Sequence, residues 1–294
     1  MIKINQYRLF LFPIFLFLIF SLLTAAGCRI ERKGEQPAPA PQSKPEQQNN
    51  LTVPPQLQGL ELQGGSESTS RKISKDVVID YSAKYPKMVY LSGSKRTNKI
   101  ALTFDDAPDN VYTPQILDIL KQYNVKATFF VIGKTAQNYP DIMKRIVEEG
   151  HVIGNHSFNH ANIAKLSPAE FAQDLDLAEQ TIFNLTGIKT AFYRSPYGVL
   201  SDEIVKILDD KGYKIVAWSV DSLDWKGLTA EQVEANIFSN VTKGSIILQH
   251  SAGGPEEDLS GTVKALPKII EKLQQQGYQF VTVDKLLNLP AEKK

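Results

Sequence analysis

The stretch Ile100-Ala101-Leu102-Thr103-Phe104-Asp105-Asp106 is a short, mostly apolar run that ends at two adjacent carboxylates. From Lys99 onward, runs of this kind alternate with helical patterns, which predicts βα units and a mostly parallel sheet. The predicted strands are seven runs, at 100–104, 127–132, 151–154, 191–193, 214–219, 245–248 and 279–281. We therefore expect an α/β fold, a distorted and incompletely closed (β/α)7-8 barrel of mostly parallel strands. An open doubly wound sheet is the alternative.

Two capping boxes predict helix starts in this part of the chain. They are Ser167-Pro168-Ala169-Glu170 and Thr229-Ala230-Glu231-Gln232, in which a hydroxyl and a side chain three residues later satisfy backbone N–H groups reciprocally. After the first box, apolar residues recur at intervals of four and three, as on one face of a helix. These residues are Phe171, Leu175, Ala178, Ile182 and Leu185.

The beginning of the chain has the pattern of an export signal. Lys3 and Arg8 flank or precede an apolar run at 9–23 that is interrupted only by Pro13 and Ser21. The run is short for a stable membrane span, and its flanks are those of a secretory signal. We therefore predict a signal peptide over residues 1–27.

The end of this signal resembles a bacterial lipobox. Small residues, Ala25-Ala26-Gly27, lead into Cys28, the only cysteine of the chain. We predict lipidation of Cys28 and attachment, through this lipid anchor, to the outer face of the bacterial cytoplasmic membrane, facing the cell wall. Cleavage after Ala26 and an uncleaved anchor are the alternatives. A single cysteine permits no intrachain disulfide.

Composition divides the rest of the chain. There is no aromatic residue between Phe20 and Tyr81, and the interval is rich in Pro and Gln, so it cannot bury enough apolar surface to offset its conformational entropy. We predict a disordered, lipid-anchored linker at 28–70, a short extension packing on the barrel at 71–97, the main domain at 98–289 and a tail at 290–294.

Net charge argues against a nucleic-acid partner. The formal net charge is +1 at pH 7, including Lys3 and Arg8 of the predicted signal. The folded part has no basic stripe that alternates with aromatic residues, which is the usual electrostatic footprint of a nucleic-acid binder. We therefore expect no nucleic-acid partner. Separately, we expect the protein to be a monomer.

Chemically active residues gather at the carboxyl ends of the predicted strands. In parallel barrels this is the face on which active sites are built. The residues in question are Asp105 and Asp106 after the first strand, His156 and His160 after the third, Arg194 after the fourth, Asp221 and Asp224 after the fifth, and His250 after the sixth.

One Asp and two His can form a three-ligand metal site with an open position for water. His156 and His160 are four residues apart, which predicts two rings on one side of a helical turn. The spare carboxylate of the Asp105-Asp106 pair would then act as a general base, and the residues alone leave open which Asp has which role. We expect His151, which lies in a strand pattern, to be structural.

The ordered motifs of this chain resemble those of the polysaccharide deacetylases of carbohydrate esterase family 4, also called the NodB homology domain. The resemblance covers roughly residues 98–289. It rests on five motifs, at 103–108, 156–160, 194–197, 221–225 and 248–250.

The resemblance divides the roles at the predicted metal site. It implies that Asp106, His156 and His160 bind the metal, whereas Asp105 is the general base. Arg194 would pair with Asp105 and orient it.

The same resemblance supplies the rest of the pocket. The backbone N–H of Tyr197, after Pro196, would hold the oxyanion. Asp224 would be hydrogen-bonded to His250, the general acid, while Trp225 and Leu248 would line the pocket for the acetyl methyl group.

The activity implied is metal-dependent hydrolysis of N-acetyl groups from a cell-wall or related N-acetylglucosamine polymer, with release of acetate. The expected substrate is an acetylated glycan, peptidoglycan or chitooligosaccharide. The expected metal is Zn²⁺, with Co²⁺, Ni²⁺ or Fe²⁺ as alternatives.

Two other functions remain open from the sequence. One is a carbohydrate-binding lipoprotein with little or no turnover, which the replacement of the family's usual glycine by Ala107 would favour. A positive φ at that position would strain an alanine. The other is an esterase that removes O-acetyl groups from xylan with the same site.

Overall fold

The computed structural model describes residues 80–254 and 256–294. The predicted signal peptide, the linker and Cys28 lie outside the described residues, as do residues 71–79 of the predicted extension. In the described part, no helix combines the length and apolar character needed to cross a bilayer.

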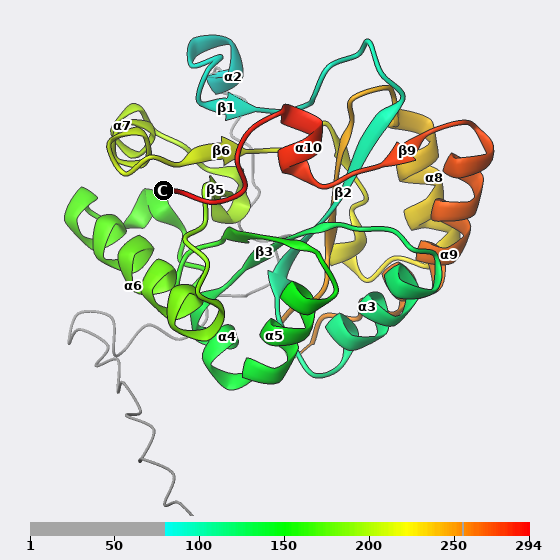
Figure 1. Cartoon of the computed structure of the whole chain (residues 1–294), viewed down its shortest axis with the longest axis horizontal. Coiled ribbons are helices and arrows are strands. Elements are labelled where there is room, and N and C mark those ends of the chain that lie inside the picture. Colours follow the sequence, from blue (N-terminus) through cyan, green and yellow to red (C-terminus); the bar gives the residue numbers. More distant parts are fainter. Residues whose placement is uncertain (1–79, 255) are drawn as a thin grey trace, which may run out of the picture. The chain divides into compact units, whose positions relative to one another are not determined.

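The core of the domain is a parallel sheet (Figure 1). Its hydrogen-bonded order is β1-β6-β5-β4-β3-β2-β8-β7, and β9 pairs with β2 beside this path. The strands are β1 (Val89–Tyr90), β2 (Lys99–Ala107), β3 (Thr128–Val131), β4 (Val152–Asn155), β5 (Phe192–Tyr193), β6 (Lys214–Val216), β7 (Val220–Asp221), β8 (Ile246–His250) and β9 (Gln279–Phe280).

The connection between β6 and β7 shows that the sheet curls. β6 pairs with β1 and β5, whereas β7 pairs with β8 at the other end of the strand order. Only residues 217–219 separate the two strands, so the opposite ends of the sheet must approach each other. The predicted fold class, an incompletely closed (β/α) barrel, is therefore confirmed.

Helices cover the convex side of this sheet (Figure 1). Ile100, Leu102 and Phe104 of β2 are buried with Ile116, Leu117 and Leu120 of α3 and with apolar residues of α5, α8 and α9. The helices are α2 (Tyr81–Lys84), α3 (Tyr112–Gln122), α4 (Gly133–Asn138), α5 (Pro140–Glu148), α6 (Pro168–Thr186), α7 (Asp202–Asp210), α8 (Ala230–Asn240), α9 (Ser260–Gln275) and α10 (Val283–Leu287). Both predicted capping boxes are present, at the starts of α6 and α8.

Alternate residues of the strands point the other way, into the barrel. Ala101, Phe130, Phe192, Val216 and Ile246 form a second buried cluster, because successive side chains of a strand face opposite sides. Val283 and Leu286 of α10 belong to the same cluster. The barrel interior is thus a packed core, and the polar site lies beyond it along the strands.

The structure corrects two predicted strand boundaries. The predicted strand at 214–219 ends at Val216, and a separate short strand, β7, follows. The predicted strand at 100–104 continues to Ala107 as β2, so Asp105 and Asp106 lie within a strand rather than after it. Residues 80–97 contain α2 and β1, and β1 pairs with β6.

Candidate active site

Asp105 and Asp106 reach one site because β2 is irregular. Regular alternation would send adjacent side chains to opposite faces. However, the pairing of β2 with β3 shifts register between Phe104 and Ala107, and Asp106 has a φ of 66°. This left-handed residue turns both carboxylates towards the same end of the barrel, although the strand does not stop there.

Ala107 does not have the positive φ that would strain an alanine at this position. The positive φ angle in this motif falls on Asp106 and not on Ala107. Ala107 is fully buried in the apolar core, and its carbonyl accepts the backbone N–H of Ile132. An alanine is therefore accommodated here, and this departure from the family pattern gives no reason to expect an inactive site.

Asp106, His156 and His160 converge on one point. Each offers one ligand atom, and these atoms lie within 4.8 Å of one another. The Nε2 atoms of His156 and His160 are 3.4 and 3.2 Å from Asp106 Oδ1. The three residues are buried. These three residues are the ones that the family resemblance implies as metal ligands, and their arrangement could hold a metal ion.

The tautomer of His156 suits a ligand. Its Nδ1 lies 2.8 Å from the carbonyl oxygen of Arg194, which can only accept, so Nδ1 carries a proton and Nε2 presents a lone pair when the ring is neutral. Metal-binding histidines commonly donate their other ring N–H in this way.

The site attracts positive charge. Burial lowers the pKa of His156, but the charges of Asp105 and Asp106 outweigh burial and hold this pKa above its usual value. Burial raises the pKa of Asp106, yet the neighbouring histidines hold it well below its usual range. A divalent cation, with one carboxylate and two imidazole ligands, would satisfy this demand.

The spacing of the two histidines predicted a helical turn, but they do not lie on one. Residues 156–160 form a loop after β4, in which Ser157 and His160 have φ angles of 69° and 54°. The ring centroids of His156 and His160 are nevertheless 5.0 Å apart. The prediction of a helical turn was wrong because the loop is fixed by side-chain hydrogen bonds, such as that from His160 N–H to Ser157 Oγ, and by contacts with neighbouring elements, and not by helical backbone hydrogen bonds.

Arg194 is enclosed in the barrel interior beside Asp105. Its Nη1 donates to Asp105 Oδ1 at 2.6 Å and to Thr103 Oγ1 at 2.8 Å. Its Nε and Nη2 donate to the carbonyls of Val216 and Ala217, and its guanidinium lies 4.0 Å from the ring centroid of Phe130. The implied Arg194–Asp105 pair is therefore present.

A second hydrogen-bonded pair lies across the site. His250 Nδ1 is 2.7 Å from Asp224 Oδ1, and Asp224 Oδ2 accepts the His250 N–H and the Thr262 hydroxyl, both at 2.8 Å. Burial raises the pKa of Asp224, but the charge and hydrogen bonds of His250 lower it below its usual value. His250 also neighbours Asp105 in the register of β2 and β8.

The remaining predicted residues surround these pairs. Tyr197 follows Pro196 in the short helix η2 (Pro196–Gly198) with a φ of 60°, and its ring centroid is 4.8 Å from that of His160. Trp225 follows Asp224 in η3 (Asp224–Lys226) and is buried, as is Leu248 two residues before His250. Their roles in binding acetyl groups and the oxyanion stay predictions.

His151 is separate from this site. Its Nδ1 accepts the N–H of Ala127, and its ring packs edge-on against Phe129. Burial, with Lys126 and Arg145 nearby, lowers its pKa to about 4. These contacts agree with the expectation of a structural histidine.

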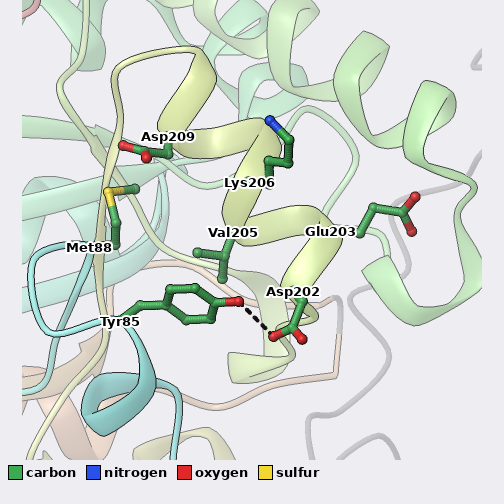
Figure 2. Close-up of a pocket in the computed structure, with 7 residues that line it drawn as sticks. All are labelled: Tyr85, Met88, Asp202, Glu203, Val205, Lys206 and Asp209. Atoms are coloured by element: carbon green, nitrogen blue, oxygen red, sulfur yellow. Dashed lines mark hydrogen bonds between the residues drawn. The ribbon is translucent and has the colours of Figure 1, made fainter.

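A pocket of about 490 Å³ lies along α7 (Figure 2). Tyr85 points across it towards Asp202, and the two side chains are hydrogen-bonded at 3.0 Å. Met88, Val205 and Asp209 also line it. It contains no residue of the predicted site, so it gives no evidence about the chemistry considered above.

One buried residue of the site was missed by sequence reasoning. Asp174 of α6 accepts backbone N–H groups from the loop between His156 and His160. A signal was present, since Asp174 falls between Phe171, Leu175 and Ala178 on the apolar face of the helix. A carboxylate on a buried helix face requires partners.

At the carboxyl end of this incomplete (β/α) barrel, an Asp-His-His cluster lies with an Asp105–Arg194 pair and an Asp224–His250 pair. This arrangement is typical of a metal-dependent hydrolase. A family model described as polysaccharide deacetylase matches residues 92–216. A peptidoglycan-N-acetylglucosamine deacetylase of Bacillus cereus is 44% identical over 203 residues, which cover 69% of this chain and 73% of the relative. The chain belongs to the polysaccharide deacetylase family, carbohydrate esterase family 4.

Solved structures agree with this assignment. The Bc1960 peptidoglycan N-acetylglucosamine deacetylase, in complex with an N-hydroxybenzamide compound, has a TM-score of 0.70 and 41% identity, covering 74% of this chain and all of that chain. BA3943, a CE4 family pseudoenzyme from Bacillus anthracis, has a TM-score of 0.63 and 33% identity, covering 67% and 68%. The family thus includes a pseudoenzyme. Family membership alone therefore does not establish turnover, and the residues of the site decide it.

Proposed function

We propose that this protein is a metal-dependent polysaccharide N-deacetylase that acts on N-acetylglucosamine residues of peptidoglycan and releases acetate. The observation that carries the proposal is the convergence of Asp106, His156 and His160 between a buried Asp105–Arg194 pair and a buried Asp224–His250 pair. Metal ligands, a base and an acid are thereby brought to one end of the barrel.

The ligand residues fit a divalent metal, and Zn²⁺ is the metal we propose. Imidazole nitrogen and carboxylate oxygen are common zinc ligands. When bound, such a cation supplies Lewis-acid chemistry, lowering the pKa of water and polarising an acyl carbonyl.

Asp105 is placed to accept a proton. Arg194 holds Oδ1, whereas Oδ2 lies 3.7 Å from His156 Nε2 and so faces the ligand cluster. One carboxylate oxygen is thus anchored by Arg194, and the other faces the ligand cluster. We assign Asp105 as the general base.

His250 is placed to give a proton. Its Nδ1 lies 2.7 Å from Asp224 Oδ1, and we assign Nε2 as the atom that protonates the substrate. Protonation of the departing nitrogen at this atom converts a poor leaving group into a free amine. Water supplies the oxygen of the released acetate, and the proton taken by Asp105 balances the proton given by His250.

Tyr197, Trp225 and Leu248 complete the proposed substrate site. The backbone N–H of Tyr197 donates to the oxyanion that forms during attack. Trp225 and Leu248 enclose the acetyl methyl group in an apolar pocket. The relatives named above as peptidoglycan-N-acetylglucosamine deacetylases support this choice of substrate.

Acetate release tests the proposal against its alternatives. The zinc-loaded protein should release acetate from N-acetylated peptidoglycan fragments or chitooligosaccharides, and chelation should abolish release. Binding of these glycans with no release would favour the carbohydrate-binding alternative. Release from O-acetylated xylan alone would favour the esterase.

The export pattern supports a location for this activity. We infer that Cys28 is lipidated and tethers the domain to the outer face of the cytoplasmic membrane, within reach of the wall. Cys28→Ser should move the protein from the membrane fraction to the soluble exported fraction. Unchanged membrane fractionation would contradict a lipid anchor and favour an uncleaved signal.

A further inference from the structure

The loop that carries both histidine ligands adopts a conformation that needs external support. Ser157 and His160 both have φ angles in the left-handed region, which costs a non-glycine residue free energy. Residues 156–160 belong to no helix or strand. The separation of the two imidazoles therefore depends on side-chain hydrogen bonds and packing that hold this loop, and most of these groups belong to neighbouring elements.

Helix α6 supplies a carboxylate to the middle of this loop. Asp174 Oδ2 accepts the backbone N–H of Phe158 at 2.7 Å, and Oδ1 accepts the N–H and the side-chain amide of Asn159 at 3.2 and 3.3 Å. Asp174 is only 2% exposed. Three donors thus converge on one buried carboxylate, midway between the two ligands.

Neutral contacts add to the support. Asn155 Oδ1 accepts the N–H of Ser157, and Ser157 Oγ accepts the N–H of His160, both at 2.9 Å. The N–H groups of Gly133 and Lys134, at the start of α4, donate to the carbonyls of Ser157 and Phe158 at 3.0 Å. The Phe158 side chain is buried with Leu177 and Ala178 of α6. Among these supports, Asp174 alone is an acidic side chain, and it alone binds two successive loop N–H groups.

We propose that Asp174 is a positioning residue for the metal centre, whose buried carboxylate fixes the backbone between His156 and His160 and thereby sets the geometry of the two imidazole ligands. The proposal rests on the proposed function, because it assigns Asp174 to the metal site used there. It adds a residue that hydrogen-bonds to the loop at Phe158 and Asn159, between the two histidines.

An amide cannot replace this carboxylate without a mismatch. In Asp174→Asn, either the oxygen facing Phe158 N–H or the oxygen facing the Asn159 donors becomes an NH₂ group. A donor then faces a buried donor, which leaves both unsatisfied. The variant keeps the size of the side chain but loses part of the hold on the loop.

The test is zinc affinity, measured on the purified full-length protein by competition with a chromophoric chelator after metal removal. Asp174→Asn should bind Zn²⁺ about 10- to 100-fold more weakly than the wild type, as outer-shell substitutions at metal sites commonly do. Asp176→Asn is the matched control, because Asp176 lies on the same helix, is 61% exposed at its side chain and pairs with Lys211. Its affinity should equal that of the wild type.

Urea unfolding in the presence of EDTA separates positioning from stability. Wild-type zinc affinity in a folded Asp174→Asn variant would overturn the proposal, whatever its stability. If that variant does not fold, Asn159→Ala removes one donor to Asp174 and should weaken zinc binding by a smaller factor, and wild-type affinity there would overturn the proposal instead. A wild type that binds zinc but releases no acetate would refute the proposed function and leave this inference standing.

Discussion

At the residue scale, the central feature is the proposed division of roles between Asp105 and Asp106. A single left-handed residue, Asp106, lets both carboxylates face the histidines. Asp106 lies against His156 and His160, whereas Asp105 is held by Arg194. The same substitution at neighbouring positions should therefore have different effects.

Asp105→Asn should retain bound zinc and lower kcat by about 10²- to 10⁴-fold, because it removes only the proton acceptor. Asp106→Asn should lose zinc as well as activity, because it removes a ligand. Metal content after gel filtration, measured with acetate release on the same samples, checks both outcomes. Turnover near the wild-type rate in Asp105→Asn would show that Asp105 is not the general base. Full zinc content in Asp106→Asn would show that Asp106 is not a metal ligand.

The lowered pKa of His151 predicts that the free energy of unfolding depends on pH, and His151 lies outside the active site. Burial first, then Lys126 and Arg145, lower its pKa from 6.5 to about 4. A histidine with a depressed folded-state pKa contributes stability that is present above pH 6.5 and is lost as the pH falls towards 4. The full loss is on the order of 3 kcal/mol.

The measurement is urea unfolding in EDTA between pH 7 and pH 4, comparing the wild type with His151→Gln, whose side chain does not titrate. The free energy of unfolding should fall more steeply with acid in the wild type than in the variant. Parallel pH profiles for the two proteins would show that His151 titrates normally in the folded state.

Positive φ angles mark the site more clearly than any single motif. Seven non-glycine residues have positive φ in the part of the chain described by the structure. Of these, Asp106, Ser157, His160 and Tyr197 lie in the site, and Leu223 directly precedes Asp224. Such conformations persist only where surrounding contacts impose them, which explains why sequence patterns did not reveal them.

At the scale of elements, β4 supports the site through a glycine. A Cβ atom added to Gly154 would lie 2.5 Å from the ring of Phe130, and that ring lies against the Arg194 guanidinium. Because Gly154 has no side chain, the Phe130 ring can stack on the Arg194 guanidinium. Arg194 in turn holds Asp105.

Gly154→Ala should lower the free energy of unfolding by about 1–3 kcal/mol through overpacking. It should also lower kcat by roughly ten- to a hundredfold, because Arg194 moves. Gly187→Ala is the control. Its φ is 73° but no atom lies within 4 Å of the added Cβ, so it should cost about 1 kcal/mol of stability and leave kcat unchanged. Equal effects of both variants on kcat would contradict the role of the stack.

Elements with a long pattern were predictable, whereas short or tertiary ones were not. The capping box and the apolar face predicted α6 because both signals are local. β1, β5, β7 and β9 have two residues each, too few for any periodicity. β5 and β9 were predicted because apolar runs contain them, whereas β1 and β7 are defined by their pairing with β6 and β8. The histidine loop was predicted as a helical turn from its spacing alone, which does not reveal its contacts with α4 and α6.

At the scale of the whole molecule, the order of strands brings the five motifs together. β2, β4, β5, β7 and β8 each deliver one motif at or near the carboxyl end, and the curl of the sheet makes those ends converge. The positions of the site residues were therefore predictable from the alternation of strands and helices. Their distances and the support from Asp174 required the structure.

The central claim is that this barrel end hydrolyses N-acetyl groups with the help of a bound metal. Its most direct test is mass analysis of muropeptides from N-acetylated peptidoglycan after incubation with the zinc-loaded protein, the EDTA-treated protein and zinc-supplemented Asp106→Asn. We predict deacetylated N-acetylglucosamine residues only with the zinc-loaded wild type. Fully acetylated muropeptides despite bound zinc, or equal deacetylation by all three samples, would contradict the account.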